Sequence, residues 1–455
     1  MAAFMAGAVS ATATTMGMRS MCGPHRSASL SSSRKVLFAF AQRDASLRTP
    51  RRRAMVTTSA STGESTDTTA ETTSTTSLAK KIVVVGGGNS AGYFARAVVA
   101  AGRGADLCIV AGENVLPYER PALSKAFLHK ESPARLPGFH TSVGGGGERQ
   151  TQEWYDANGV EVMLSTRVTA ADLANKTLTT DTGAHITYDK LVVATGCSAL
   201  KLPAAMGGAL PGVHYVRDNA DALALYDAMG SAKKAVVIGG GYIGLECAAS
   251  LATWGLNPNV VLMEPHTMAR LWTPEIAAKY EAVYESKGTV FHRATKVVKI
   301  VEKDGKACGV EIEGGVVLEA DIVVVGVGAG VPTAPFDILD TTPEKFPGGI
   351  KVDATFAASG SGVEPQSVYA IGDIAAFPLS SDGDKLVRME HVAHARASAT
   401  HAAAAVMDSA NAAAYQYLPF FYSRVFEHGG SERKVSWVFY GLQGGNEVVV
   451  VGDFA

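Results

Sequence analysis

The stretch KKIVVVGGGNSAGYFARAVVAAG, from Lys80 to Gly102, decides the fold class of this 455-residue chain. Its apolar run from Ile82 to Val85 is typical of a strand that is buried on both faces. The turn that follows has the spacing Gly86-x-Gly88-x-x-Ala91, and apolar residues then recur with helical periodicity. Glycines let the backbone approach a pyrophosphate, and the first N–H groups of a helix can bind it. The stretch therefore predicts a strand–turn–helix unit that binds a dinucleotide.

The same pattern occurs a second time. KKAVVIGGGYIGLECAASLATWG, residues 233–255, contains Gly239-x-Gly241-x-x-Gly244. Each unit is followed by a strand-like run that ends in an acid, Glu113 in the first case and Glu264 in the second. Such an acid can accept hydrogen bonds from the ribose of a dinucleotide. A single Gly-x-Gly-x-x-Gly is weak evidence of a site, but two in this context predict two dinucleotide sites.

Two further segments indicate which site holds which dinucleotide. YDKLVVATG, residues 188–196, is an apolar strand with a Thr-Gly turn, and VYAIGDIAAFP, residues 368–378, contains Asp373 just after a strand. They resemble the closing motifs of the FAD domain in flavoprotein reductases with two dinucleotide sites, where the aspartate holds the ribityl chain. Because these motifs flank the second unit, we expect FAD at the first site and a nicotinamide nucleotide at the second. We expect LEADIVVVGVG, residues 318–328, to return the chain to the FAD domain.

The predicted fold is α/β, with two Rossmann-like domains, the NAD domain inserted in the FAD domain, and a small α+β C-terminal domain. We predict that the FAD domain comprises residues 79–198 and 321–404, and that the NAD(P) domain comprises residues 199–320. The C-terminal domain, residues 405–455, looks truncated, so we expect an open sheet edge, poor solubility of the isolated chain, or a partner that covers the edge.

The first 78 residues are expected to precede the fold as a transit peptide and linker. Up to residue 60 the chain is rich in Ala, Ser, Thr and Arg, and its only acid is Asp44. This composition is typical of an organellar transit peptide, with a merely disordered tail as the alternative. The Ser and Thr content favours a plastid over a mitochondrion.

Composition limits the classes of function. The net charge of −2 argues against a general nucleic-acid binder, and no run of eighteen apolar residues predicts a membrane span. The five cysteines include no C-x-x-C pair, which argues against a dithiol redox centre, and no constellation of ligands predicts a metal site.

The stretch PYERPALSKAF, residues 117–127, places two cations on a turn that follows the second strand of the FAD domain. We expect Arg120 and Lys125 to offset the charges of the pyrophosphate and of reduced flavin. Pro121 suits the first turn of a helix, so a helix is expected to begin there. The alternative is a solvated turn with a weak pair between Glu119 and an arginine.

The acid at the second site bears on the choice of nicotinamide nucleotide. Glu264 can accept both ribose hydroxyls of NADH and would repel the additional phosphate of NADPH. Arg270 lies close enough in the sequence to weaken that preference. We therefore expect NADH, with NADPH possible.

These motifs together resemble the monodehydroascorbate reductase family of plants and algae. The similarity spans residues 80–440 and includes PYERPALSKAFL, ARLPGFHTSVGGGGERQTQEWY, GGGYIGLE, RMEHVAHARASA and YLPFFYSRVFE. PYERPALSK alone is also similar to bacterial ferredoxin-reductase-like flavoproteins. The resemblance implies reduction of the ascorbate radical by NAD(P)H through FAD, with the two-domain fold derived above.

The resemblance also implies roles near the flavin. Glu390 and His391 are expected to approach the nicotinamide, and Val392 the flavin. Arg396 and Tyr422 are the predicted catalytic residues that contact ascorbate, and Tyr422 also lies against the flavin. The alternatives are a surface cation for Arg396 and core or capping roles for the histidines.

The complete set of predicted ligands follows from the motifs and the resemblance. For FAD they are Gly86, Gly88, Asn89, Ser90, Ala91, Glu113, Arg120, Lys125, Val168, Arg217, Asp373, Val392 and Tyr422. For the nicotinamide nucleotide they are Gly240, Gly241, Tyr242, Ile243, Gly244, Glu246, Glu264, Arg270, Gly328, Glu390 and His391.

Two other functions are compatible with this architecture. One is a ferredoxin- or rubredoxin-type reductase, which would need a basic surface around the flavin edge. The other is a flavoprotein redox sensor of the apoptosis-inducing-factor kind, in which NADH switches a partner interface. Rates with the ascorbate radical and with a redox protein would separate these possibilities.

Overall fold

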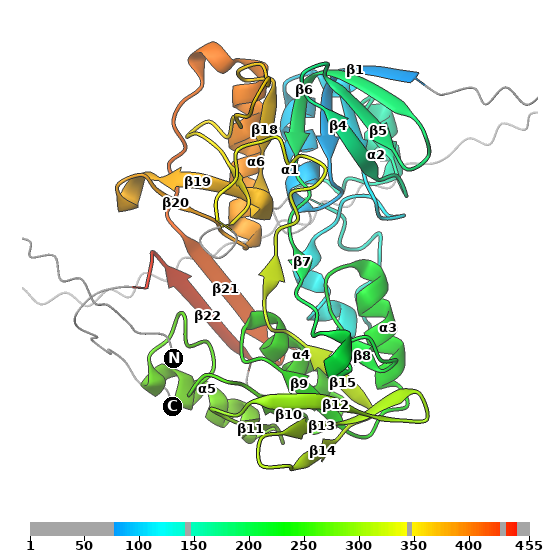
Figure 1. Ribbon diagram of the computed structural model, residues 1–455, viewed down its shortest axis with the longest axis vertical. Helices are drawn as coiled ribbons and strands as arrows, with labels where there is room; N and C mark the ends of the chain where they lie inside the picture. Colours follow the sequence, from blue (N-terminus) through cyan, green and yellow to red (C-terminus); the bar gives the residue numbers. More distant parts are fainter. Residues whose placement is uncertain (1–76, 142–146, 344–347, 428–433, 444–455) are drawn as a thin grey trace, which may run out of the picture. The chain divides into compact units, whose positions relative to one another are not determined.

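The structure is a computed structural model that describes residues 77–141, 147–343, 348–427 and 434–443 (Figure 1). The predicted transit peptide lies outside these residues, as do residues 142–146 of the glycine-rich loop and the chain after residue 443. Within the described part of the chain, no helix is long and apolar enough to cross a membrane.

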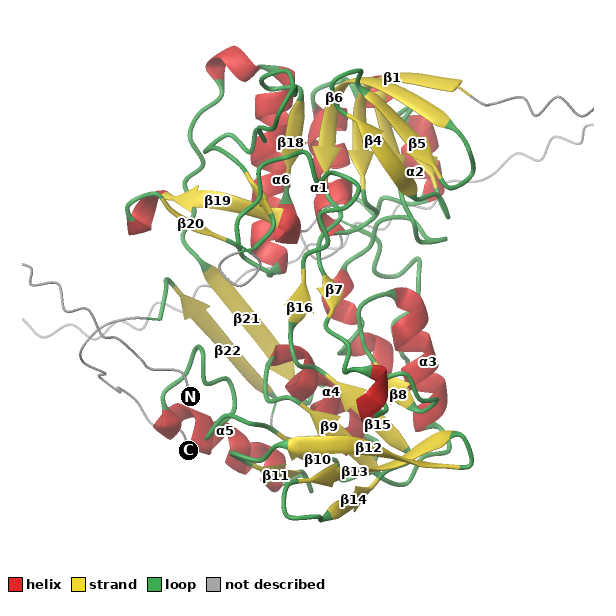
Figure 2. Ribbon diagram, viewed as in Figure 1, coloured by secondary structure: helices red, strands yellow, loops and turns green. Residues whose placement is uncertain are grey.

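Seven strands form the first sheet, in the order β3-β2-β1-β6-β5-β4, with β18 beside the second half of β6 (Figure 2). Strands β1, β2, β3, β6 and β18 are parallel, whereas β4 and β5 form an antiparallel extension. Helices α1 and α6 pack against each other beside this sheet. The elements are β1 (Ser77–Val85), α1 (Asn89–Ala100), β2 (Leu107–Val110), α2 (Gln152–Ala157), β3 (Glu161–Met163), β4 (Val168–Asp172), β5 (Thr177–Thr180), β6 (His185–Val193), β18 (Val368–Ala370) and α6 (Val392–Met407).

Five parallel strands form the second sheet, in the order β11-β10-β9-β15-β8. An antiparallel sheet of β12, β13 and β14 packs against it through an apolar cluster. The elements are β8 (Val213–His214), α3 (Asn219–Met229), β9 (Ala235–Ile238), α4 (Tyr242–Thr253), β10 (Asn259–Val261), α5 (Pro274–Glu285), β11 (Val290–His292), β12 (Val297–Lys303), β13 (Lys306–Ile312), β14 (Val317–Glu319) and β15 (Ile322–Val325).

The second sheet is inserted into the first, as the sequence predicts. Strands β6 and β18 pair in parallel, with Leu191 opposite Val368, and the whole second sheet lies between them in the chain. The expectation for residues 318–328 is wrong, because β15 pairs with β9 and β8 of the second sheet and does not return to the first. A strand buried on both faces carries no periodicity that indicates which sheet it joins. The other domain boundaries given above stay predictions.

Three small sheets complete the described structure. Strands β7 and β16 pair near the two crossings between the large sheets, β17, β19 and β20 form a second small sheet, and β21 pairs with β22. The last strand exposes the side chains of Val438 (56%) and Tyr440 (64%). Because residues 444–455 are not described, the predicted open edge stays a prediction. The elements are β7 (Ser198–Ala199), β16 (Ala329–Gly330), β17 (Ile350–Lys351), β19 (Ala375–Leu379), β20 (Lys385–Val387), β21 (Phe420–Val425) and β22 (Val435–Tyr440).

An aromatic cluster encloses His394 on helix α6. The imidazole is fully buried, stacks on Phe377 with ring centroids 4.6 Å apart, and lies 3.3 Å from the Tyr415 hydroxyl through Nδ1. Burial disfavours the charged ring and lowers the pKa of His394 to about 4. The core role considered for this histidine is therefore the one that the structure supports.

We predict that His394 makes the fold acid-sensitive. The ordinary histidine pKa in the unfolded chain lies near 6.5, so the unfolded state binds the additional proton between about pH 6.5 and pH 4. The free energy of unfolding should therefore fall by up to about 3 kcal/mol as the pH decreases through this window. Urea unfolding of the wild type and of His394→Gln at pH 7.5 and pH 5 would measure this decrease. We expect the free energy of unfolding to depend less on pH in the variant. His185→Gln, at an exposed histidine, is the matched control; equal pH dependence in all three proteins would contradict the prediction.

Candidate active site between the two glycine turns

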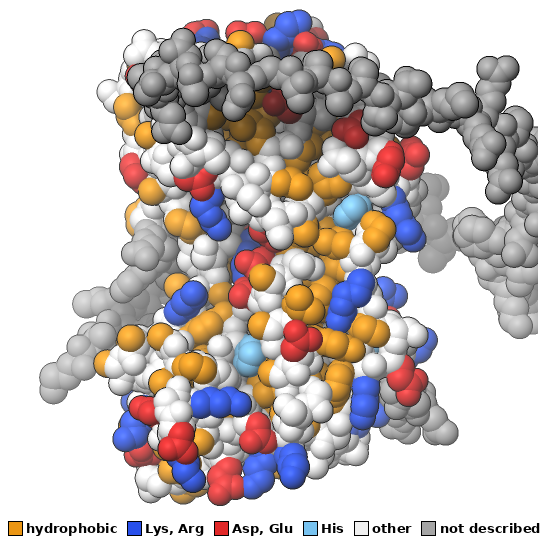
Figure 3. Space-filling view, turned by 90° about the vertical axis from the view of Figure 1, so that its right-hand side faces the viewer, with side chains coloured by type: hydrophobic (Ala, Val, Ile, Leu, Met, Phe, Trp, Pro, Cys, Tyr) orange, Lys and Arg blue, Asp and Glu red, His pale blue; other side chains and the backbone are white. Residues whose placement is uncertain are grey.

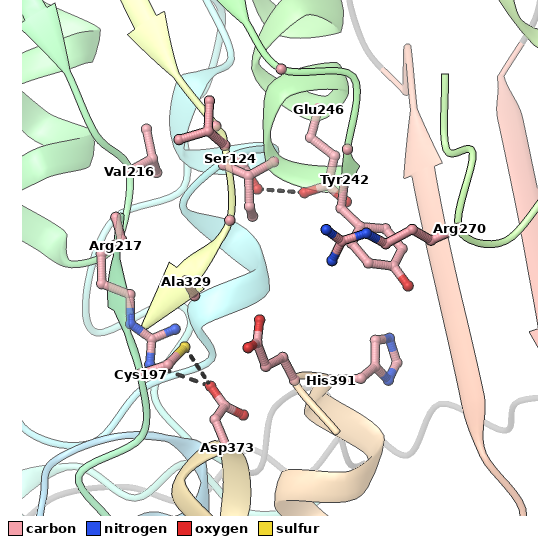
Figure 4. Close-up of a pocket in the computed structure, with 18 of the residues that line it drawn as sticks. Ser124, Cys197, Val216, Arg217, Tyr242, Glu246, Arg270, Ala329, Asp373 and His391 are labelled. Atoms are coloured by element: carbon pink, nitrogen blue, oxygen red, sulfur yellow. Dashed lines mark hydrogen bonds and ion pairs between the residues drawn. The ribbon is translucent and has the colours of Figure 1, made fainter. Parts of the chain in front are cut away.

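A cavity of about 1140 Å³ joins the two glycine turns. Its wall combines the N-terminal ends of α1 and α4, the turn after β2, the segment after β20, and Tyr422 of β21. Figure 4 shows side chains from these elements that point into it. The cavity therefore brings both predicted dinucleotide turns to one place.

The two turns have the same construction. Gly86 and Gly239 have φ values of +130° and +113°, and a Cβ on either would lie 2.2 Å from a backbone carbonyl oxygen, that of Ala194 or Gly326. Helices α1 and α4 begin after Gly88 and Gly241 without a side-chain cap, so their first N–H groups have no side-chain acceptor at the cap. A phosphate at each helix N-terminus suits this geometry, and the turns fit two dinucleotides.

The cation-bearing turn after β2 is not the helix that we expected. Pro121 lies within a short 3-10 helix, η2 (Arg120–Ala122). The chain leaves helical geometry at Lys125, whose φ and ψ are −125° and −104°, before η3 (Ala126–Leu128). The prediction of one helix is therefore wrong. This break lets the Lys125 ammonium reach Glu246 on α4, at 2.6 Å.

Arg120 lines the cavity and is held from several sides. Its guanidinium pairs with Glu113, and it donates to the Tyr118 hydroxyl and the Arg217 carbonyl, both at 2.9 Å. Glu113 itself lies outside the cavity wall and also accepts from the Tyr118 hydroxyl at 2.8 Å. A ribose contact by Glu113 stays a prediction, because its carboxylate serves Arg120 here.

The alternative of a solvated turn does not hold. Glu119 is buried, with 6% of its surface exposed, and its partner is Arg396 of α6, 2.9 Å away, rather than a neighbour in the turn. Asn89 and Tyr93 of α1 also donate to this carboxylate. Arg396 does not line the cavity in this arrangement, although its neighbour Ala395 does.

Glu246 is the centre of a buried polar cluster beside the cavity. Besides Lys125, its carboxylate accepts from the hydroxyls of Ser124 at 2.5 Å and Ser423 at 2.6 Å (Figure 4). The three donors come from the turn after β2 and from β21. The ion pair between Lys125 and Glu246 would place a compensated charge beside the ring of a bound cofactor.

A second cluster surrounds Asp373, which follows β18. Its carboxylate accepts from the Cys197 thiol at 3.2 Å and pairs with Arg217 at 3.4 Å (Figure 4). Burial, followed by the charge of Asp373, raises the pKa of Cys197, so the thiol stays protonated. All three side chains line the cavity and fit a polar, hydroxylated cofactor chain.

Helix α6 begins at the cavity with Val392, and Glu390 and His391 directly precede it. His391 is its N-cap and accepts from the Ala393 N–H at 3.2 Å, so the capping role is confirmed. Burial lowers its pKa to about 4, and the ring is therefore neutral at pH 7. Glu390 pairs with Arg388 at 2.5 Å.

Aromatic side chains close the cavity on the side of β21. The Tyr422 ring lies 5.2 Å from that of His391, and the backbone nitrogen of Tyr422 lies 3.3 Å from His391 Nε2. Tyr242, at the start of α4, stacks on Phe421 with an interplanar angle of 16°. Tyr422 therefore lies on the strand, β21, that contacts both α4 and α6.

The end of the cavity near the second turn holds the predicted specificity residues. Glu264 and Arg270 are both exposed and line the wall, together with Ile243 and Gly328. His266 lies between them in the sequence and also lines the wall, although the sequence analysis did not single it out.

Most of the predicted ligands meet at the cavity. The residues that line it are Gly88, Asn89, Ser90, Arg120, Lys125, Arg217, Gly240, Gly241, Tyr242, Ile243, Glu246, Glu264, Arg270, Gly328, Asp373, Glu390, His391, Val392 and Tyr422. Six do not: Gly86, Ala91, Glu113, Val168, Gly244 and Arg396. Gly86, Ala91 and Gly244 shape the turns from behind, and Val168 begins β4. The ligand roles of the whole set stay predictions.

Several residues that hold this site together are not among the predicted ligands, and of these Glu119 was considered only as the partner in a weak ion pair. Glu119, Ser124, Cys197 and Arg388 each bond a predicted ligand. Glu119 and Ser124 lie within PYERPALSKAF. The sequence signal that could have indicated them is that each is a polar residue among prolines and apolar residues. Among the described residues, no group of three or more His, Cys, Asp or Glu side chains could hold a metal ion.

Three comparisons place the chain among known proteins. The family model described as pyridine nucleotide-disulphide oxidoreductase matches residues 80–399. A chloroplastic/mitochondrial monodehydroascorbate reductase of Arabidopsis thaliana is 47% identical over 80% of this chain and 73% of its own length. A monodehydroascorbate reductase of Pisum sativum is 45% identical over 80% of this chain and 82% of its own length.

Solved structures with this fold include reductases that act on redox proteins. A ferredoxin reductase for the CYP199A2 system of Rhodopseudomonas palustris has a TM-score of 0.68 and 30% identity, over 82% of this chain and 86% of that one. Putidaredoxin reductase, in a covalent complex with putidaredoxin, has a TM-score of 0.70 and 26% identity, over 82% and 84%. The chain therefore belongs to the pyridine nucleotide-disulphide oxidoreductase family and, within it, to the monodehydroascorbate reductases.

Proposed function

We propose that the chain reduces the monodehydroascorbate radical to ascorbate with NADH, through bound FAD. The observation that carries the proposal is the continuous cavity from the second glycine turn, past the first, to Tyr422. One NADH and one proton would convert two radical anions into two ascorbate monoanions and NAD⁺. FAD, when bound, accepts a hydride and gives up its two electrons singly.

On the FAD side, the chain's residues would bind and orient the cofactor. The N-terminus of α1 and Arg120 suit its pyrophosphate, and Asp373 suits its ribityl hydroxyls. Lys125, paired with Glu246, would lie near the ring system. Because these cations are already ion-paired, they can compensate charge with little reorganisation.

On the nucleotide side, Glu264 would bind the ribose hydroxyls, which favours NADH. Glu390 and the neutral His391 would face the nicotinamide, where a neutral imidazole can accept or donate one hydrogen bond without competing for the positive charge of NAD⁺. Arg270 leaves NADPH as a weaker alternative.

On the acceptor side, Arg396 would attract the radical, which is an anion at neutral pH, and Tyr422 would contact it. Arg396 lies behind the wall near Ala395, so its guanidinium acts at the edge of the cavity rather than within it. Burial lowers the pKa of Arg396, but the neighbouring carboxylate of Glu119 outweighs burial, and the pKa is raised. The guanidinium is therefore charged throughout the physiological range.

A redox protein as acceptor is the second candidate, because the structural relatives named above act on ferredoxin and putidaredoxin. Such an acceptor is acidic and would need a basic surface at the flavin edge. On the face in Figure 3, Lys and Arg side chains are interspersed with Asp and Glu. The described residues on the face in this view therefore form no continuous basic patch.

We also propose a plastid location. The first 60 residues have the composition of a transit peptide, and the relatives include chloroplastic/mitochondrial, chloroplastic, peroxisomal and cytosolic proteins. Import of the full-length precursor into isolated chloroplasts and mitochondria would distinguish the two organelles.

The function is tested with the purified mature chain and a radical source. Ascorbate oxidase generates the radical, and NADH consumption is followed at 340 nm with and without the oxidase. We expect a yellow protein whose NADH oxidation requires the radical. A colourless protein that does not take up FAD, or one that prefers ferredoxin, would overturn the proposal.

Arg396→Ala should raise the KM for the radical about tenfold or more, because one favourable charge–charge contact is lost. Reduction of the flavin by NADH in a stopped-flow experiment should be unchanged, since Arg396 does not face the nucleotide. Equal losses in the two half-reactions would contradict this assignment. Arg424→Ala, at an exposed arginine of β21, is a matched control.

Glu264→Gln should change the choice of nucleotide. Removing the carboxylate charge weakens the repulsion of the 2′-phosphate, so the ratio of kcat/KM for NADPH to that for NADH should rise about tenfold. Arg270→Ala should move the ratio in the opposite direction. An unchanged ratio in both variants would show that the ribose lies elsewhere.

A further inference from the structure

We propose that Glu119 is the residue that positions Arg396 for the anionic acceptor and links it to the FAD-binding turn. The proposal rests on the function proposed above, because it gives Arg396 its role towards the radical. Glu119 does not line the cavity, and we infer that it contacts no ligand.

Glu119 is the meeting point of three donors. Its Oε2 accepts from the Arg396 guanidinium at 2.9 Å and from the Asn89 carboxamide at 2.5 Å, and its Oε1 accepts from the Tyr93 hydroxyl at 2.7 Å. The donors come from α6 and from the first two turns of α1. A carboxylate with 6% of its surface exposed is tolerated only when such partners compensate its charge.

Arg396 depends on this carboxylate for its orientation. Its side chain is 23% exposed, and its guanidinium lies 5.2 Å from the centre of the Tyr93 ring. An arginine side chain has many rotamers, and a partly buried ion pair selects one of them. Because Tyr93 also bonds Glu119, the ring and the carboxylate together define one position for the guanidinium.

Asn89 connects this arrangement to the glycine turn. It is the first residue of α1, directly after Gly88, and its Oδ1 accepts from the Arg120 N–H at 3.1 Å. Its carboxamide therefore joins the pyrophosphate turn, the cation-bearing turn and Glu119. We infer that these hydrogen bonds fix the position of Arg396, the residue that binds the acceptor, relative to the turn that binds FAD.

The sign of the effect separates positioning from simple electrostatics. Glu119 is negative, so on charge alone its removal should strengthen the binding of an anion near Arg396. If Glu119 acts by positioning, its removal should weaken binding, because Arg396 loses its defined orientation.

The experiment is a double-mutant cycle of Glu119→Ala and Arg396→Ala in the FAD-loaded protein. We expect Glu119→Ala to raise both the KM for the radical and the Kd for ascorbate, measured by calorimetry, by about three- to tenfold. The double variant should match Arg396→Ala alone, since Glu119 acts through Arg396. The rate of flavin reduction by NADH should stay at the wild-type value.

Two further variants control for a general structural effect. Glu119→Gln keeps an oxygen that can accept from Arg396, so its KM and Kd should lie between those of the wild type and of Glu119→Ala. Glu281→Ala removes another buried glutamate, which pairs with Arg293 at 2.6 Å on the inserted domain, and should leave both constants unchanged. If Glu119→Ala does not retain FAD, the cycle is carried out with Glu119→Gln, and the effects should again be non-additive.

The outcomes distinguish the two proposals. Tighter or unchanged ascorbate binding in Glu119→Ala, or an effect that adds fully to that of Arg396→Ala, overturns the positioning role while the function stands. No change in Arg396→Ala overturns the proposed acceptor site itself.

Discussion

The close approach of a glycine to a neighbouring strand is the constraint on which this structure depends. At Gly86 and at Gly239 the turn lies so near a carbonyl oxygen that any Cβ would overlap it. Only this approach lets the strand, the turn and the helix pack with the helix N-terminus open towards the cavity. Because the chain builds the same turn twice, two helix N-termini face one cavity.

Four cations at the site are paired with buried or partly buried carboxylates. Arg120 pairs with Glu113, Lys125 with Glu246, Arg217 with Asp373 and Arg396 with Glu119. An unpaired buried charge would be costly, whereas a pair fixes the geometry of the cation before a ligand arrives. Three of these four pairs join distant segments: Lys125 connects the turn after β2 to α4, Glu119 connects it to α6, and Arg217 connects the segment before α3 to Asp373 after β18. The same ion pairs therefore orient the side chains of the site and connect segments of the fold.

This arrangement separates the two halves of the proposed reaction within one family fold. The nucleotide end is exposed and polar, with Glu264 and Arg270 at the rim. The opposite side is aromatic and includes Tyr422 and His391, whose neutral ring also caps α6. Reductases of small redox proteins share this fold with the chain, so the fold alone does not determine the acceptor.

The sequence alone determined the two glycine-turn units, their inserted order and a set of residues most of which line the cavity, because glycine spacing and strand hydrophobicity are local properties. It did not determine that β15 joins the second sheet, because a strand buried on both faces looks the same in either sheet. It also did not determine the break in the turn after β2, or the partners of Glu119, Lys125 and Arg396. Ion pairs form between groups that lie close together in the folded chain, and Glu119 and Arg396 are 277 residues apart in the sequence. Only the tertiary structure brings them within 2.9 Å.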